Sequence, residues 1–114
     1  MSRYLLLMRG DQTGFLAMSS ADKKKRVAEH INYSKELQEK KIFIDGVGCY
    51  ETSVILSKSG RSIKTSKNPF AGTDDQLSGF YVIQAKNDEE AVKIAKKCPA
   101  LVHGETIEVV KLGH

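Results

Sequence analysis

The sequence predicts an α+β fold of the ferredoxin-like βαββαβ type, to which a hairpin adds a strand. Two segments with capped starts and helical periodicity alternate with short apolar segments that are typical of strands. Right-handed crossovers would place both helices on one face of one sheet. The length of 114 residues is that of one domain, so we expect residues 1–114 to form a single domain.

The first half of the chain contains a strand, a long helix and a second strand. Residues 4–8 are apolar, and the turn pair Gly10-Asp11 follows them. Ser19 and Asp22 have the spacing of a capping box, which opens a helix that runs to about Lys40. Residues 42–44 begin the next strand. At 100° per residue, one arc of the helix carries Val27, His30, Ile31, Tyr33, Ser34 and Leu37.

The second half contains a hairpin, a loop, a short helix and the last strand. Residues 52–57 and 62–65 read as strands around a Ser59-Gly60 turn, and residues 66–79 form a long polar loop before a strand at 80–83. Asn87 caps a helix that Pro99 ends, and residues 106–112 form the last strand. The expected inner face of this helix comprises Ala91, Val92, Ala95 and Cys98.

Composition excludes several classes of protein. With 40% hydrophobic and 28% charged residues, the chain is ordinary for a folded domain, and no segment approaches the roughly 18 apolar residues that cross a bilayer. Residues 4–8 are too short for a signal peptide, so we expect a cytoplasmic protein with no membrane partner. Cys49 and Cys98 are expected to be buried, reduced thiols, and no ligand spacing indicates a metal site or another cofactor.

The apolar strands also predict a homodimer. A sheet face that is bare to water should carry polar residues at alternate positions. Residues 5–7 and 80–83 are instead apolar at both parities, and the chain has no third helix to cover the second face. A second copy is the simplest cover.

Several separated motifs resemble one family. Pro69-Phe70-Ala71 and the segment 76–81 (QLSGFY) resemble the motif D-G-P-F-A-E-[TS]-K-E-x-[LI]-x-G-F of the YCII-related, or DGPF-domain, family. The Cys98-Pro99-Ala100 segment and the closing strand are also similar to that family. The resemblance extends over nearly all residues and implies a dimeric α+β barrel, with a cleft near the first helix and the long loop.

Family chemistry can be carried over only where the residues match. The resemblance implies a His–Asp pair in some relatives, dehalogenation or lactone chemistry in one branch, and association with sigma-factor systems for DGPF members. In this chain Lys67-Asn68 replaces the leading Asp-Gly of the motif, Gly72 replaces its Glu, and Val47 replaces an acidic residue. An acid–base role of the motif's Asp therefore does not carry over.

His30 is the main catalytic candidate, because imidazole titrates near neutrality and this residue lies on the apolar arc of the helix. The alternative is a core histidine bonded to the backbone. Asp45 could orient the imidazole, or could be an ordinary acid at a turn or strand edge.

Lys67, Asn68 and Phe70 are the substrate-binding candidates, because long loops in small domains are often functional. A lysine beside an aromatic ring suits a small anionic ligand with an apolar body, and we expect this loop to border one cleft with His30. The alternative is a loop that only packs across the fold.

Two functions follow. The first is a small-molecule-binding homodimer with weak acid–base activity on a small anionic or lactone-like substrate. The second is a non-enzymatic regulatory or interaction module of the sigma-factor-associated type. RNA-recognition motifs share the βαββαβ order, but Ser78, Val82 and Ala85 stand where their strand motif needs basic or aromatic residues, so nucleic acid is not an expected partner.

Overall fold

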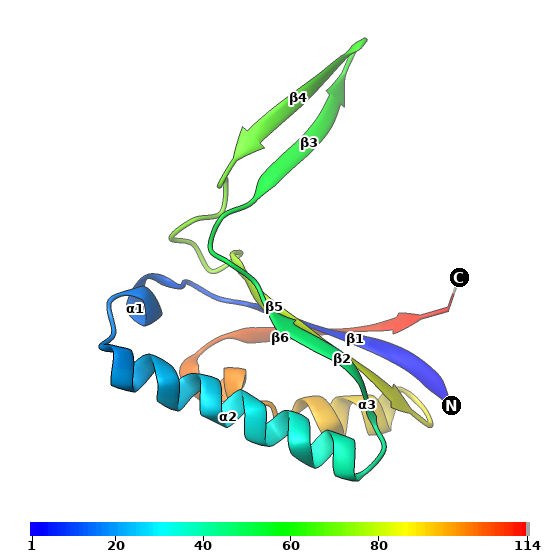
Figure 1. Cartoon of the computed structure of the whole chain (residues 1–114). Coiled ribbons are helices and arrows are strands. Elements are labelled where there is room, and N and C mark those ends of the chain that lie inside the picture. Colours follow the sequence, from blue (N-terminus) through cyan, green and yellow to red (C-terminus); the bar gives the residue numbers. More distant parts are fainter. Residues whose placement is uncertain (114) are drawn as a thin grey trace.

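The computed structural model of the chain describes residues 1–113 and has a four-stranded sheet with helices on one face (Figure 1). All strand pairs are antiparallel, and the order β2-β5-β1-β6 is that of a ferredoxin-like fold. The predicted fold class is confirmed, although the sheet of one chain is open and is not a closed barrel. The elements are β1 (Ser2–Arg9), α1 (Thr13–Leu16), α2 (Ser20–Glu39), β2 (Phe43–Gly48), β3 (Val54–Ser59), β4 (Ser62–Lys67), β5 (Leu77–Ala85), α3 (Asp88–Ala95), the 3₁₀ helix η1 (Pro99–His103) and β6 (Thr106–Leu112).

Both long helices begin at the predicted caps. The Ser19 side chain accepts a hydrogen bond from the backbone N–H of Asp22, and Asn87 accepts one from Glu90. Each bond satisfies a backbone donor that the first helical turn leaves free. The short helices α1 and η1 were not predicted, because each is a single turn with little periodicity to detect.

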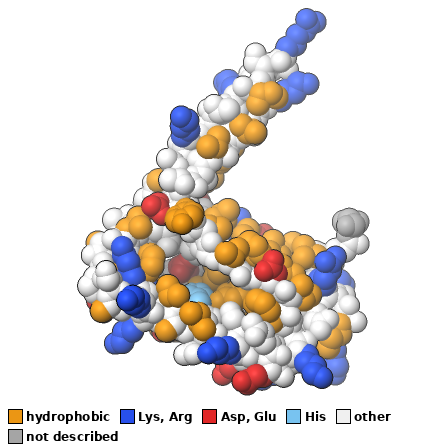
Figure 2. Space-filling view, in the orientation of Figure 1, with side chains coloured by type: hydrophobic (Ala, Val, Ile, Leu, Met, Phe, Trp, Pro, Cys, Tyr) orange, Lys and Arg blue, Asp and Glu red, His pale blue; other side chains and the backbone are white. Residues whose placement is uncertain are grey.

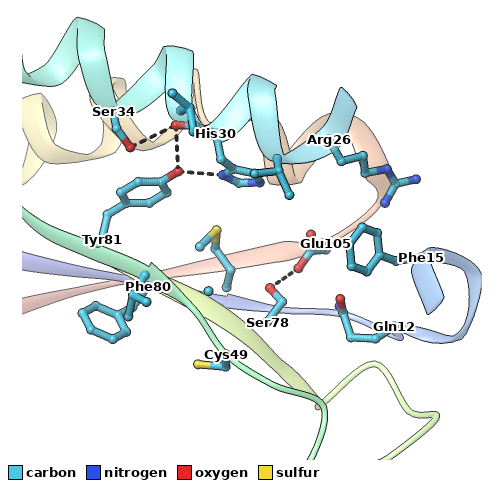
Figure 3. Close-up of a pocket in the computed structure, with 16 residues that line it drawn as sticks. Gln12, Phe15, Arg26, His30, Ser34, Cys49, Ser78, Phe80, Tyr81 and Glu105 are labelled. Atoms are coloured by element: carbon cyan, nitrogen blue, oxygen red, sulfur yellow. Dashed lines mark hydrogen bonds between the residues drawn. The ribbon is translucent and has the colours of Figure 1, made fainter. Parts of the chain in front are cut away.

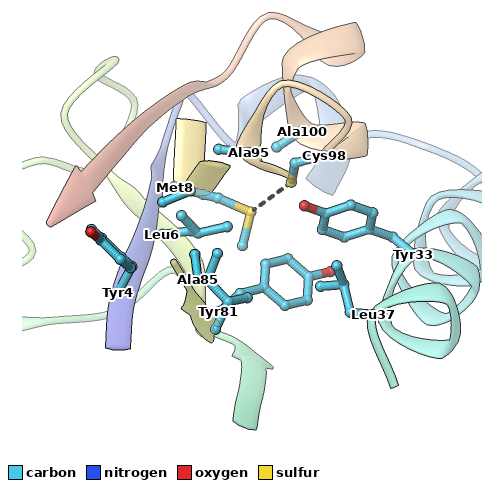
Figure 4. Close-up of a cluster of buried hydrophobic side chains, with 12 residues drawn as sticks. Tyr4, Leu6, Met8, Tyr33, Leu37, Tyr81, Ala85, Ala95, Cys98 and Ala100 are labelled. Carbon is cyan, nitrogen blue, oxygen red and sulfur yellow. Dashed lines mark hydrogen bonds between the residues drawn. The ribbon is translucent and has the colours of Figure 1, made fainter. Parts of the chain in front are cut away.

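The core lies between the sheet and the helices (Figure 4). Alternate residues of β1 and β5 point into it and meet Tyr33 and Leu37 of α2. The Cys98 thiol contacts the Met8 sulfur at 3.8 Å. The side chains from the two strands are Tyr4, Leu6, Met8, Tyr81, Ile83 and Ala85.

Two expectations about exposure were wrong, those for Val92 and Cys49. Val92 is 40% exposed on α3, where Ala91 and Ala95 are buried and Ile94 packs against the core. Val27 and Ile31 are about half exposed because the first half of α2 stands away from the sheet. Cys49 is an exposed thiol just after β2, whereas Cys98 is buried as predicted.

The hairpin does not add a strand to the main sheet. β3 and β4 pair with each other in a separate two-stranded sheet, which rises from the face opposite the helices (Figure 1). The long loop is shorter than predicted because β4 extends to Lys67 and β5 begins at Leu77.

The middle of the second face of the main sheet is apolar, as its sequence suggested, and the Arg9–Glu108 ion pair lies beside it. Leu5 pairs with Val82 and Val110 on that face, and Leu7 pairs with Phe80. All five side chains are partly exposed. Within the part of the chain that the structure describes, no helix covers this face (Figure 1).

Candidate functional site

A cavity of about 370 Å³ lies between the first half of α2 and one edge of the sheet (Figure 3). This volume is within the range of small-molecule sites in proteins. Its position explains the exposure of Val27 and Ile31, which form part of its wall. The lining residues are Met8, Gln12, Phe15, Arg26, Val27, His30, Ile31, Ser34, Gly46, Val47, Gly48, Cys49, Ser78, Phe80, Tyr81 and Glu105.

The imidazole of His30 reaches the cavity from α2, and Tyr81 of β5 holds it in place. The Tyr81 hydroxyl lies 2.6 Å from His30 Nδ1 and 3.5 Å from the His30 carbonyl oxygen. The two rings are stacked with centroids 5.9 Å apart. Ser34 donates to the same carbonyl at 2.9 Å, so that oxygen already has a good partner. We therefore assign the Tyr81 hydroxyl as the donor and His30 Nδ1 as the acceptor of this hydrogen bond.

This hydrogen bond sets the protonation pattern of the pair. Burial raises the pKa of Tyr81 to about 12, so its hydroxyl remains a donor at neutral pH. Burial also lowers the pKa of His30, although the negative charge of Glu105 opposes this effect. A neutral His30 that accepts at Nδ1 carries its hydrogen on Nε2. The ring thus has a second hydrogen-bonding nitrogen available for a bound molecule.

The carboxylate of Glu105 enters the cavity beside this ring. Its Oε1 accepts a hydrogen bond from the hydroxyl of Ser78, the residue that begins the cavity wall on β5. Gly10 makes room for it, because a Cβ at that position would lie 2.6 Å from Glu105 Cγ. The turn after β1 and the segment before β6 thereby fix the position of this carboxylate.

The rest of the lining is mainly apolar with two further polar groups. Arg26 contributes a guanidinium, and Gln12 contributes an amide that also donates to the Gly10 carbonyl at 2.9 Å. Phe15 lies at the same end of the cavity as Arg26 and Glu105 (Figure 3). An apolar wall with a few convergent polar groups is the usual composition of a ligand site.

Asp45 does not hold the imidazole of His30. Its Oδ1 accepts from the backbone N–H of Gly46 at 2.8 Å, and its side chain is outside the cavity lining. Asp45 pairs with Val82 on the sheet face away from the helices, whereas its neighbour Gly46 pairs with Tyr81. Alternation along β2 therefore turns Asp45 away from His30, and Tyr81 takes the orienting position.

Lys67, Asn68 and Phe70 are also outside the cavity lining. Lys67 ends β4, and Phe70 is 39% exposed in the loop that follows. Asn68 has a structural contact, because its side chain accepts from the backbone N–H of Ser53 at 2.8 Å while its own N–H donates to the Ser53 carbonyl. Within one chain, the loop and His30 do not border one cleft.

Sequence reasoning named His30, which lines the cavity, but did not name the groups around it. Tyr81 and Ser78 stand in the segment 76–81 that carries the family motif, but that pattern does not show which side chains face the helix. Glu105 and Arg26 appear in the sequence as ordinary surface charges. The role of Gly10 cannot be recognised in the sequence, because it depends on the close approach of Glu105 in the folded chain.

Side chains suited to a metal ion do not gather anywhere in the part of the chain that the structure describes. In residues 1–113, no cluster of three or more His, Cys, Asp or Glu side chains has a metal-binding arrangement. None of the helices in this range has the length and hydropathy needed to cross a bilayer.

Replacing Tyr81 with phenylalanine should alter His30 more than it alters the fold. The change leaves Nδ1 without its donor, and we expect a loss of about 1–2 kcal/mol in the free energy of unfolding. Because the lost bond stabilises neutral imidazole, the pKa of His30 should rise toward its ordinary value. Side-chain ¹⁵N NMR across pH 4–8 measures both the pKa and the tautomer. An unchanged tautomer and pKa would contradict the assigned hydrogen bond, and His103 provides an internal reference.

The chain was compared with known proteins. No curated protein matches it. The family model of the YCII-related domain matches residues 2–112, which include every strand and helix described above. The match extends from β1 to β6 and so includes all the residues that line the cavity. The chain therefore belongs to the YCII-related domain family.

Proposed function

We propose that the protein binds a small anionic or lactone-like molecule in this cavity and transfers a proton on it. The observation that carries this proposal is the His30–Tyr81 hydrogen bond at 2.6 Å, which fixes one imidazole nitrogen and leaves the other for a ligand. A core histidine without a function would be expected to have both nitrogens satisfied by the protein or to lie away from a cavity.

The roles of the side chains follow from their chemistry. Neutral His30 donates from Nε2 to a carbonyl or carboxylate oxygen, and Arg26 supplies positive charge for an anionic group. Glu105 is the only carboxylate among the residues that line the cavity, so it is the proton acceptor. The apolar residues of α2 and β2 hold the body of the ligand.

A thermal-shift screen of small carboxylic acids and lactones tests this proposal. A ligand at 100 times its dissociation constant stabilises the folded protein by about 2.7 kcal/mol, which raises the melting temperature by roughly 10 °C in a domain of this size. His30→Asn should remove the shift. His103→Asn is the matched control, because His103 pairs with Glu29 outside the cavity. A shift of equal size in His30→Asn and the wild type would contradict the proposal.

We also propose that the protein is a cytoplasmic homodimer in which the second copy covers the open sheet face. Five partly exposed apolar side chains on that face, Leu5, Leu7, Phe80, Val82 and Val110, support this assembly.

Sedimentation equilibrium at micromolar concentration should give twice the chain mass of 12.6 kDa. Val82→Lys should lower this mass toward that of one chain, because a dimer would bury the added charge. A wild-type protein that sediments as one chain across this range would contradict the homodimer.

A further inference from the structure

The hairpin β3–β4, which we call the arm, has no partner strand among residues 1–113 of its own chain. Its two strands pair only with each other, and all twelve of their residues are exposed. Figure 1 shows the arm standing away from the main sheet on the side opposite the helices. At its base, the paired hydrogen bonds between Ser53 and Asn68 connect the two strands. These bonds fix the point at which the arm leaves the sheet.

The arm has two different faces. Residues that are paired across an antiparallel ladder share a face, and neighbours along a strand alternate. The first face carries three large aliphatic side chains, Val54, Leu56 and Ile63, which are 57%, 64% and 62% exposed, and it also carries Lys58, Thr65 and Lys67. The second face carries Ile55, Ser57, Ser59, Ser62, Lys64 and Ser66. The serine-rich face suits water, whereas the row of Val54, Leu56 and Ile63 on the first face, which we call the aliphatic face, is typical of a sheet packed against another surface.

An arm of this kind needs a cover to be stable. An isolated two-stranded hairpin is at best marginally stable in water, because it buries too little apolar surface to offset the ordering of its backbone. The hydrogen bonds between Ser53 and Asn68 fix only the base of the arm. Contacts on the aliphatic face would therefore have to come from outside the chain.

The solvent-accessible surface of the chain indicates how much area a partner would bury. A monomeric protein of 12.6 kDa exposes roughly 6,200 Å² by the usual scaling of area with mass. This chain exposes 7972 Å². The surplus of roughly 1,800 Å² is more than the approximately 800 Å² that each partner of a standard interface buries, and it matches an obligate homodimer.

We propose that the arm is a clasp, whose aliphatic face packs against a second copy of this chain. The arm rises from the same side of the sheet as the open apolar face, so the two surfaces form an inner corner. Figure 2 shows apolar side chains along the arm and over the main body in the same view. Under twofold symmetry the body of each copy fills the corner of the other, and the same surface serves both.

The main rival occupant is nucleic acid. Lys58, Arg61, Lys64 and Lys67 are basic, and residues 52–73 contain no acidic residue. Phosphate contacts would use these cations, which do not gather on one face: Lys64 is on the serine-rich face, Lys58 and Lys67 are on the aliphatic face, and Arg61 is in the turn. Aliphatic side chains neutralise no phosphate, so nucleic acid would leave Val54, Leu56 and Ile63 uncovered. The second copy covers this face and is therefore the better occupant.

The proposal rests on the proposed homodimer but adds a separate element to it. The test compares two double variants by sedimentation equilibrium from 0.1 to 50 µM. Leu56→Lys with Ile63→Lys places two charges on the aliphatic face, and the matched control, Ser57→Lys with Ser62→Lys, places two on the serine-rich face. We expect the first to raise the dimer dissociation constant at least ~100-fold and the control to change it less than ~3-fold. Both should keep the helical circular dichroism of the wild type, since the arm is outside the core.

Isotope-filtered NMR on a mixture of labelled and unlabelled copies gives a second readout. Methyl groups of Leu56 and Ile63 should show contacts to the unlabelled copy, whereas Ile55, on the other face, should show none. Equal effects of the two double variants, or an absence of intermolecular contacts at Leu56 and Ile63 in a dimer, would overturn the clasp and leave the sheet-face dimer standing. A wild-type monomer that binds a DNA duplex through the arm lysines would overturn both.

Discussion

Leu6→Lys is expected to leave the chain unfolded at 25 °C. Leu6 is 0% exposed at the centre of the sheet, paired with Tyr81 on one side and Val109 on the other. Losing the buried side chain costs about 2–5 kcal/mol, and burying an unpaired ammonium costs several more. The sum is similar to the whole stability of a small domain, about 5–15 kcal/mol. Circular dichroism and urea titration measure the outcome.

Leu5→Lys is the control for this change. Leu5 is the neighbouring residue on β1 but points to the open face of the sheet, where it is partly exposed. This variant should keep its helical signal and a cooperative urea transition, while the dimer weakens. If Leu6→Lys melts like the wild type, the core assigned between the sheet and the helices is wrong.

Gly79→Val should be strongly damaging, although Gly79 itself only lies between two residues that line the cavity, Ser78 and Phe80. A Cβ at Gly79 would lie 2.8 Å from the Val47 carbonyl oxygen and 3.1 Å from Gly48 Cα. Both atoms belong to the backbone of β2, which cannot move without breaking its pairing with β5. We expect a loss of about 2–4 kcal/mol and a fall in melting temperature of roughly 10–15 °C.

Gly48→Ala is the control for Gly79→Val. It tests whether any added side chain near the cavity lowers the stability of the fold. Its added Cβ would have the Ser78 carbonyl oxygen as its nearest neighbour at 3.8 Å, an ordinary contact distance. Its melting temperature should therefore change by no more than about 3 °C. Similar losses in the two variants would show that the close approach of β2 to Gly79 has no special cost.

Local signals in the sequence predicted most of the fold. Ser19 and Asn87 marked the two helix starts because a cap is a short-range hydrogen bond that the neighbouring residues determine. The apolar run at 4–8 and the alternation at 106–112 marked two strands of the main sheet. The arm was placed wrongly because a hairpin pattern shows that two strands pair with each other and does not show which sheet they join.

The site was less predictable because its groups come from separate elements. Helical periodicity placed His30 on the inner side of α2, and that inference required only one segment. The pairing of His30 with Tyr81, and the approach of Glu105 past Gly10, depend on how distant strands align. Asp45 was chosen for its chemistry, but a single step along β2 decides which face a side chain occupies.

A crystal structure of the protein soaked with small carboxylic acids tests the central claim most directly. The account predicts a bound acid in the cavity, with its carboxylate within hydrogen-bond distance of His30 Nε2 and near Arg26, and with its apolar part against Val27 and Ile31. The Tyr81 hydroxyl should remain bonded to His30 Nδ1. Acids bound only elsewhere on the protein, with the cavity empty at millimolar concentrations of every acid tested, would contradict the account.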